Sequence, residues 1–173
     1  LVVGPVVVRQ GAQSSLCLLA EKLQIPVMAT SKARGVIAED HPLYAGVMSG
    51  VYAPNTLETR LIDRSDLVVA IGLDRVELLS PWKHTQPLIT IDSIPIEPNE
   101  VVGAPAHTAT GNLPDLIGAL TNGVSQRVAW DAVDIERFWS EAIAELGALD
   151  TNLNAATALR AARRMAPRDS FLT

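Results

Sequence analysis

Two short, almost entirely apolar runs dominate the middle of the chain. Leu67 to Ile71 and Leu88 to Ile91 are rich in Val and Ile, and they end at Gly72 and Asp92, respectively. Such runs are typical of parallel strands that are buried on both faces of a sheet. In an open parallel sheet the ligand crevice lies beyond the carboxyl ends of the strands. We therefore expect Gly72 and Asp92 on the rim of a crevice that suits a nucleotide. These residues do not indicate a particular reaction.

The composition limits the classes of function. The 173 residues suit one well-filled core with a short further element, because a domain typically takes ~100–150 residues. The net charge is -5 and no basic run occurs, so nucleic acid and anionic membranes are disfavoured as partners. No apolar run reaches the roughly 20 residues of a membrane span. The single Cys17 allows neither an internal disulfide nor a thiolate metal site, which favours a cytoplasmic location.

Strand and helix signals alternate on both sides of the two runs. We expect, in chain order, a strand from Leu1 to Gly4, a turn from Pro5 to Gly11, a helix from Ala12 to Leu23, a strand from Pro26 to Thr30, a helix from Pro54 to Arg64, a short helix from Leu73 to Leu79, a strand from Ala106 to Gly111 and a helix that Asn112 caps. This order predicts a Rossmann-like parallel sheet of five or six strands with helices on both faces. The first turn lacks the G-x-G-x-x-G fingerprint of dinucleotide-binding proteins.

The stretch from Ser31 to Gly50 is predicted to be one long irregular loop, since Gly and Pro interrupt any regular period. Loops of this length are usually functional or disordered. Its basic residues, Lys32 and Arg34, suit either contact with a phosphate or a solvated surface. The run from Glu39 to His41 is not favoured as a metal site, because adjacent residues rarely converge on one ion.

The composition changes near residue 121. A polar linker from Thr121 to Asp131 precedes a predicted helix from Asp134 to Leu146, which carries a continuous apolar stripe. That stripe is expected to pack either on the sheet or on another domain. A last helix is predicted from Asn154 to Met165. Because the chain opens in a strand without Met and closes on what resembles a new strand, we expect a piece of a longer protein.

Several motifs occur in an order that resembles a known family. Val27 to Thr30, Ala33 to Gly35 and Glu39 to Gly46 resemble the "PV-x-T … KG/RG … PEDHPL-x-x-G" passage of thiamine-diphosphate enzymes of the acetolactate synthase type. Asp66 to Gly72 resembles their "SDLVLAIG" strand, and Ile89 to Asp92 resembles their "HIDID" strand. Gly111 and Asn112 stand where that family has a "GD" pair before a helix.

The resemblance implies a domain organisation. Residues 1–121 would form the central domain, which is Rossmann-like and related in fold to the DHS-like nucleotide-binding domains. Residues 122–152 would be a linker with an amphipathic helix, and residues 153–173 would begin the diphosphate-binding domain. In this family the glutamate that activates thiamine belongs to the first domain, and the motif that holds Mg²⁺ and diphosphate belongs to the third. We therefore expect no catalytic residue and no metal ligand in this chain, and thiamine diphosphate with Mg²⁺ in the parent enzyme.

The resemblance also carries candidate cofactor-binding positions. Family members bind FAD, ADP or nothing in the central domain, and the positions that match the FAD-binding members are Gly4, Thr30, Gly72, Asp92, Gly111 and Asn112. The chain departs from those members after Gly72, where Leu-Asp-Arg-Val-Glu-Leu replaces a G-x-R-F-D-D-R run. The passage after Gly46 is shorter than their loop and lacks its His, and Asn112 replaces an Asp. We therefore expect no bound cofactor in this chain and keep an FAD or ADP crevice as an alternative.

The expected function is that of a non-catalytic central domain of an acetolactate synthase-like carboligase or decarboxylase that acts on 2-keto acids. Its partners would be the remaining domains of the parent enzyme, which the family assembles as homodimers or homotetramers. A free-standing flavin- or nucleotide-binding module of the electron-transfer-flavoprotein type is the alternative. A sirtuin-type module would need zinc cysteines, and a pure interaction domain would associate without any ligand.

Overall fold

The computed structural model describes residues 1–54, 56–78, 82–95, 104–125, 130, 132–148 and 155–167. Its centre is a six-stranded sheet whose order is β3-β2-β1-β4-β5-β6 and whose neighbours are all parallel. The strands are β1 (Val2–Val3), β2 (Val27–Thr30), β3 (Tyr44–Met48), β4 (Val68–Ile71), β5 (Leu88–Asp92) and β6 (His107–Thr110). This is the strand order of dinucleotide-binding Rossmann sheets, so the predicted fold class is confirmed.

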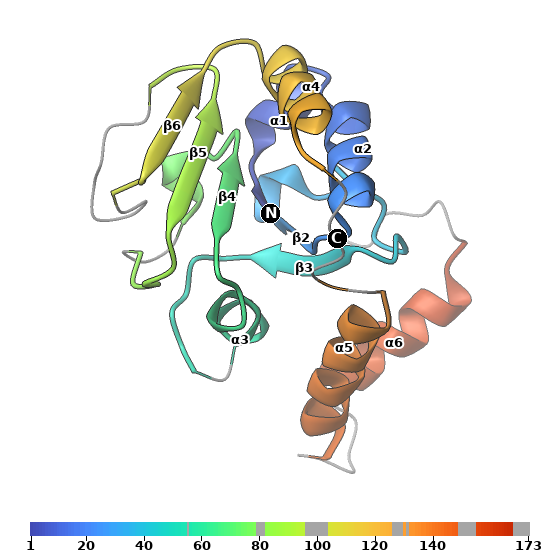
Figure 1. Ribbon diagram of the computed structural model, residues 1–173. Helices are drawn as coiled ribbons and strands as arrows, with labels where there is room; N and C mark the ends of the chain where they lie inside the picture. Colours follow the sequence, from blue (N-terminus) through green and yellow to red (C-terminus); the bar gives the residue numbers. More distant parts are fainter. Residues whose placement is uncertain are drawn as a thin grey trace. The chain divides into compact units, whose positions relative to one another are not determined.

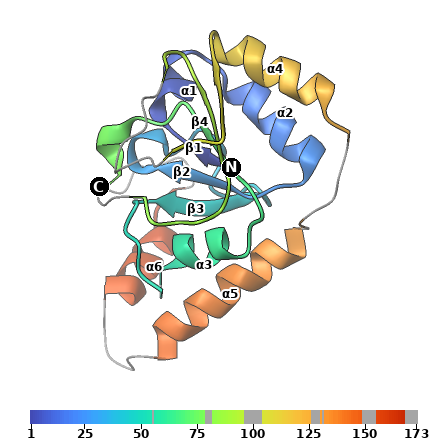
Figure 2. The same ribbon diagram turned by 60° about the vertical axis from the view of Figure 1, so that its left-hand side comes forward.

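Helices cover both faces of this sheet. The helices of the part of the chain that contains the sheet are α1 (Pro5–Arg9), α2 (Gln13–Leu23), α3 (Leu57–Asp63) and α4 (Leu113–Gly123), with single 3-10 turns η1 (Ser31–Ala33) and η2 (Arg75–Glu77). Two further helices, α5 (Ala132–Ala148) and α6 (Ala155–Met165), follow in the sequence. In both Figure 1 and Figure 2, α2 and α4 lie side by side on one face, and α3 lies on the opposite face. No helix in the described part of the chain has the length and apolar character to cross a membrane.

The chain divides into two compact units, Leu1–Ile135 and Glu136–Thr173. The first unit contains the sheet and its core. The side chains of Leu16, Leu19, Ile71, Leu113 and Ile117 are fully buried there, because the apolar stripes of α2 and α4 pack with the all-apolar strands. The second unit contains most of α5 and all of α6. Asn154, the expected cap of α6, lies outside the described residues.

The expectation of one irregular loop from Ser31 to Gly50 is wrong, because β3 lies within it. Tyr44 pairs with Val27 but Val47 pairs with Ala29, so β3 carries one extra residue at this point. Gly46, with φ of 100°, lies at that bulge. The glycine that makes the bulge also breaks the apolar alternation, which is why the sequence pattern concealed a strand.

Three further elements differ from their predicted bounds. The expected turn from Pro5 to Gly11 contains α1, a five-residue helix that starts at Pro5, where the fixed φ of proline suits a first helical position. The expected helix from Leu73 to Leu79 is reduced to η2, and Leu79 lies outside the described residues. The expected linker at Thr121 still belongs to α4, which continues to Gly123.

Two glycines allow the turn after β1 to touch the turn after β4. A Cβ on Gly4 would overlap the carbonyl oxygen of Gly72 and lie 2.6 Å from the Cα of Leu73. A Cβ on Gly72 would lie 2.9 Å from the backbone nitrogen of Val7, and its φ of 60° disfavours any other residue. The amide of Val6 donates to the carbonyl of Gly72 at 3.2 Å. The two turns are therefore in direct backbone contact.

Substitution of Gly4 by Ala should destabilise the protein by more than about 3 kcal/mol, since the added methyl meets backbone that cannot rotate away. Gly118→Ala is the matched control: Gly118 lies within α4, and a Cβ there would meet nothing within 4 Å. That change should stabilise by up to about 1 kcal/mol through helix propensity. Urea unfolding measures both. A Gly4→Ala protein with wild-type stability would show that the two turns do not touch.

Candidate functional site

A crevice opens beyond the carboxyl ends of β1, β4 and β5, where the strand order reverses and where ligands bind in sheets of this type. Its volume is about 400 Å³. Three segments line it: α1, the turn after β4 and the end of β5. The lining residues are Val6, Arg9, Gln10, Leu73, Asp74, Asp92, Ser93, Ile94 and Pro95. Asp92 borders this crevice, as expected, whereas Gly72 is not among the lining residues and contacts the turn that contains Gly4.

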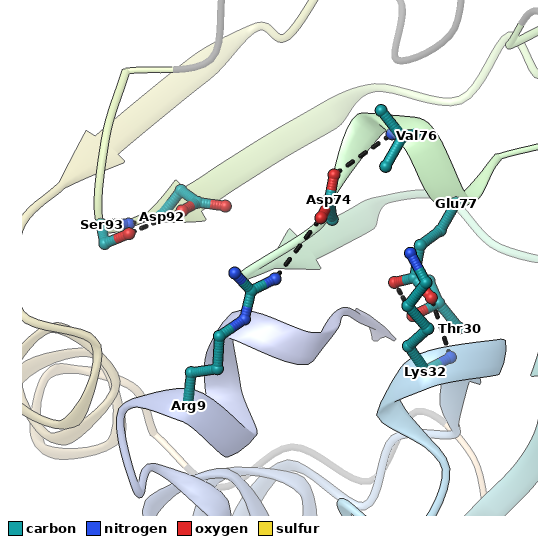
Figure 3. A network of polar contacts seen from close by, with 8 residues as sticks. All are labelled: Arg9, Thr30, Lys32, Asp74, Val76, Glu77, Asp92 and Ser93. Carbon is teal, nitrogen blue, oxygen red and sulfur yellow. Dashed lines mark hydrogen bonds and ion pairs between the residues drawn. The ribbon is translucent and has the colours of Figure 1, made fainter.

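Asp92 supplies a buried carboxylate to this crevice. It is the last residue of β5 and is 3% exposed. Its Oδ1 accepts hydrogen bonds from the backbone nitrogen of Ser93 at 2.6 Å and from the Ser93 hydroxyl at 3.2 Å. Burial raises the pKa of the Asp92 carboxyl, while the hydrogen bonds from Ser93 and from the backbone of Ile94, and the charge of Arg9, act against this rise. The other carboxylate oxygen points away from Ser93 (Figure 3).

Arg9 and Asp74 form an ion pair across the crevice. Arg9 extends from the end of α1, and its Nη2 lies 3.4 Å from Oδ2 of Asp74 (Figure 3). Asp74 also caps η2, since its Oδ1 accepts from the backbone nitrogen of Val76 at 3.2 Å. The Arg9 side chain is 62% exposed, so this pair contributes little to stability. One cation therefore faces two carboxylates among the residues that line the crevice.

The backbone donors that usually hold a phosphate at this position are already engaged. In Rossmann sheets the first turn of the first helix presents its amides to the pyrophosphate. Here Pro5 has no amide hydrogen, Val6 donates to Gly72 and Val7 donates to the carbonyl of Gly4 at 3.3 Å. The helix itself has only five residues. The crevice thus offers acceptors for hydroxyl groups but few donors for a phosphate.

Gly111 and Asn112 connect β6 to α4. The amide of Gly111 donates to the carbonyl of Asp92 at 2.9 Å, which brings these two candidate residues together through the backbone. Asn112 caps α4, as expected, because its Oδ1 accepts from the amide of Asp115 at 3.2 Å. The side chain of Gln10 accepts from the amide of Leu113 at 2.9 Å. The start of α4 is therefore capped by two side chains, and Asn112 does not line the crevice.

Thr30 takes part in a different contact. Its hydroxyl donates to Oε2 of Glu77 at 2.6 Å, and the backbone nitrogen of Lys32 donates to Oε1 of the same carboxylate at 2.8 Å (Figure 3). Glu77 is 7% exposed and belongs to η2. Glu77 therefore connects the end of β2 to the turn after β4, and the Thr30 hydroxyl is hydrogen-bonded within the protein.

Sequence reasoning missed the role of Glu77. Glu58, in the first turn of α3, is also buried, and it accepts from the backbone nitrogen and the hydroxyl of Ser49. Both carboxylates lie in helical turns after a strand, where a charged residue is normally solvated. No periodicity marks them, because their partners are far along the chain or in an irregular turn.

The remaining charged candidates are engaged at the surface. Arg34 donates to Oε1 of Glu39 from two nitrogens, at 2.8 and 3.1 Å. His41 lies 3.2 Å from Glu21. In the ranges that the structure describes, no three His, Cys, Asp or Glu residues come together as a metal-binding group.

Removal of the Glu77 carboxylate should be costly because it leaves the buried hydroxyl of Thr30 and the part-buried amide of Lys32 without acceptors. We expect Glu77→Ala to destabilise by about 2–4 kcal/mol. Glu39→Ala, which removes an exposed partner of Arg34, is the control and should cost less than about 1 kcal/mol. A double-mutant cycle with Thr30→Val, measured by urea unfolding, should give a coupling energy above about 0.5 kcal/mol. Additive effects would show that Thr30 and Glu77 do not interact.

Substitutions of Asn112 should separate its capping role from any other. Asn112→Ala removes the acceptor for the Asp115 amide and should destabilise by about 1 kcal/mol. Asn112→Asp retains that acceptor and adds a negative charge at the helix start, so stability should be equal to the wild type or higher. Thermal unfolding checks both. A loss of stability in Asn112→Asp similar to that of Asn112→Ala would exclude the cap.

The comparisons with known proteins agree with this fold. The family model of the thiamine pyrophosphate enzyme central domain matches residues 1–120. The chain is 32% identical, over 151 residues, to a probable acetolactate synthase large subunit of Methanocaldococcus jannaschii, covering 84% of this chain and 24% of that protein. It is 31% identical, over 102 residues, to an acetolactate synthase of Arthrospira platensis, covering 56% of this chain and 18% of that protein.

A solved structure gives the same result. An enzyme from Mycobacterium smegmatis that is assigned to the thiamin diphosphate-dependent enzymes superimposes with a TM-score of 0.57 at 28% identity, covering 74% of this chain and 25% of that one. The chain thus spans a quarter or less of the length of these relatives. The resemblance indicated by the sequence motifs is confirmed. The chain belongs to the thiamine pyrophosphate enzymes, whose central domain it matches over residues 1–120.

Proposed function

We propose that this chain serves as the non-catalytic central domain of a cytoplasmic enzyme that uses thiamine diphosphate to join or decarboxylate 2-keto acids. The names of its relatives, acetolactate synthase and a pyruvate decarboxylase of Schizosaccharomyces pombe, support this class of reaction. In enzymes of this family the motif that holds Mg²⁺ and the diphosphate belongs to a domain other than the central one. Thiamine diphosphate and Mg²⁺ are therefore assigned to the other domains of the parent enzyme.

The structural role is supported by the crevice itself, whose polar groups are largely bonded to one another. The contact between Gly4 and Gly72 uses the amide of Val6, which would otherwise face a phosphate. The remaining lining pairs Arg9 with Asp74 and adds the buried carboxylate of Asp92. A negatively charged dinucleotide would meet two carboxylates, one paired cation and few free amides. We infer that the domain needs no bound FAD to fold or to act as a support.

A second feature suits a supporting domain. At the amino ends of β1, β2 and β4, on the opposite side from the crevice, a groove of about 350 Å³ is lined mainly by apolar residues. Among them are Leu23, Ile25, Leu67 and Trp130. Apolar grooves of this kind are typical of surfaces that pack against another domain. We assign this groove to the remaining domains of the parent enzyme, which would assemble as a homodimer or homotetramer.

An adenine nucleotide such as ADP is the second candidate for the crevice. The observation in its favour is Asp92, whose carboxylate lines the crevice at the carboxyl end of a central strand, where such a group can accept hydrogen bonds from ribose hydroxyls. In this alternative Arg9 would leave Asp74 to contact a phosphate. The further alternative of a free-standing electron-transfer-flavoprotein module lacks support, because the family match extends over residues 1–120.

Thermal unfolding of the purified chain with FAD, ADP or coenzyme A tests the proposal. A ligand present at ~1 mM with a dissociation constant of 1 mM would stabilise by about 0.4 kcal/mol, which corresponds to a rise of about 1 °C. We expect none of the three to raise the unfolding midpoint by more than that. The protein should also be colourless when purified.

A rise of several degrees with ADP or FAD would overturn the empty-crevice proposal and support the nucleotide alternative. Asp92→Asn then serves as the diagnostic variant, because it retains the shape of the side chain but weakens an acceptor for ribose hydroxyls. Loss of the ligand-induced rise in Asp92→Asn would place the nucleotide in the crevice. An unchanged rise would place it elsewhere.

A further inference from the structure

A histidine that the crevice does not use is enclosed at another place in the sheet domain. The side chain of His84, in the segment that leads into β5, is 3% exposed. Its ring lies edge-to-face with Tyr52, at 5.2 Å between ring centroids, and with Trp82, at 5.0 Å. Tyr52 belongs to the connection between β3 and α3. The three rings therefore join two connections that are far apart in the sequence.

The polar atoms of this cluster are incompletely satisfied. Nδ1 of His84 is buried and has no hydrogen-bond partner among the described residues, and the same holds for Oε1 of Gln86. The carboxylate of Asp63, at the end of α3, lies 4.0 Å from Nδ1, which is beyond hydrogen-bond distance. Buried polar atoms are normally paired, and here no hydrogen bond from a described residue to Nδ1 holds the ring of His84 in its position.

Two charged groups act on His84, and both belong to α3. Asp63 and Glu58 favour a proton on the imidazole, whereas burial disfavours it more strongly, so the pKa of His84 is lowered below its ordinary value of 6.5. The connection from β3 contributes the neutral ring of Tyr52, and the segment before β5 contributes the neutral ring of Trp82. At neutral pH the cluster is therefore uncharged at its centre.

We propose that His84 is a protonation-sensitive latch that fastens the β3–α3 connection to the segment entering β5. Protonation adds a charge and a second N–H to a side chain that is almost fully enclosed. That charge is relieved only when the ring moves toward Asp63 or into solvent, and either movement changes its contacts with Tyr52 and Trp82. The neutral ring closes the latch and the protonated ring opens it.

The rest of the connection limits how far the opening spreads. Glu58 binds the backbone nitrogen and the hydroxyl of Ser49, at the start of the same connection. At the end of the connection, Thr56 caps the start of α3, because its hydroxyl accepts from the amide of Thr59 at 3.4 Å. Neither contact includes a hydrogen bond to His84, although the charge of Glu58 also acts on its imidazole. The change is therefore confined to the part of the connection around Tyr52, while the sheet stays folded.

A pH titration of the whole chain tests the latch. The ring proton signals of His84 in NMR spectra, assigned by their absence from a His84→Gln variant, should titrate with a midpoint below 6.5. The aromatic signals of Tyr52 and the fluorescence of Trp82 should change with that same midpoint, because an adjacent imidazolium quenches indole fluorescence. A Trp82→Phe variant identifies which part of the fluorescence change belongs to Trp82, as Trp130 and Trp139 are retained.

Asp63→Asn provides the matched electrostatic control, since Asp63 is 55% exposed and its substitution should leave the fold intact. The midpoint of His84 should fall further in this variant, because a charge that favours protonation is gone. A midpoint of His84 at or above 6.5 would overturn the proposal. So would Tyr52 and Trp82 signals that stay constant while His84 titrates.

Discussion

The close approach of two turns at Gly4 and Gly72 is the constraint on which the crevice depends. Gly4 donates to the carbonyl of Ile71 at 2.9 Å, and Gly72 donates to the carbonyl of Ile91 at 2.8 Å. Gly111 repeats the pattern at the edge of the sheet, where it donates to the carbonyl of Asp92. The ladder of backbone bonds thus continues one residue past the strands. Glycine at these positions lets the backbone of one turn fill the space in which a Rossmann sheet commonly receives a pyrophosphate.

Buried carboxylates give this edge of the sheet its chemical character. Glu77 joins the end of β2 to the turn after β4, Asp92 closes β5, and Glu58 holds the turn after β3. Each accepts at least one backbone amide, a partner that compensates an ionised carboxylate for part of its lost hydration. The negative charge of these carboxylates disfavours the binding of a phosphate at these strand ends. The carboxylates that hold the turns in place would repel an anionic cofactor, so these positions cannot serve both purposes well.

The sequence allowed much of the sheet to be predicted, because the buried strands β4 and β5 are uninterrupted apolar runs between clear turns. The cap at Asn112 was also predictable, since a polar residue after a strand and before an apolar helical period is a local signal. The strand β3 was concealed because Gly46 breaks its pattern at a bulge. Glu77 and Glu58 carried no signal at all. Their roles come from partners brought close by the fold, and local patterns contain no information on such pairs.

Amide hydrogen exchange measured by NMR tests the central claim most directly, because it reports whether the donors at the switch of strand order are bonded within the protein. We expect the amides of Gly4, Val6 and Gly72 to exchange slowly, Gly4 and Gly72 as slowly as those of β1 and β4, and added ADP or FAD to leave these rates unchanged. Exchange of these three amides at the rate of an unprotected peptide, or protection that appears only when a nucleotide is added, would contradict this expectation.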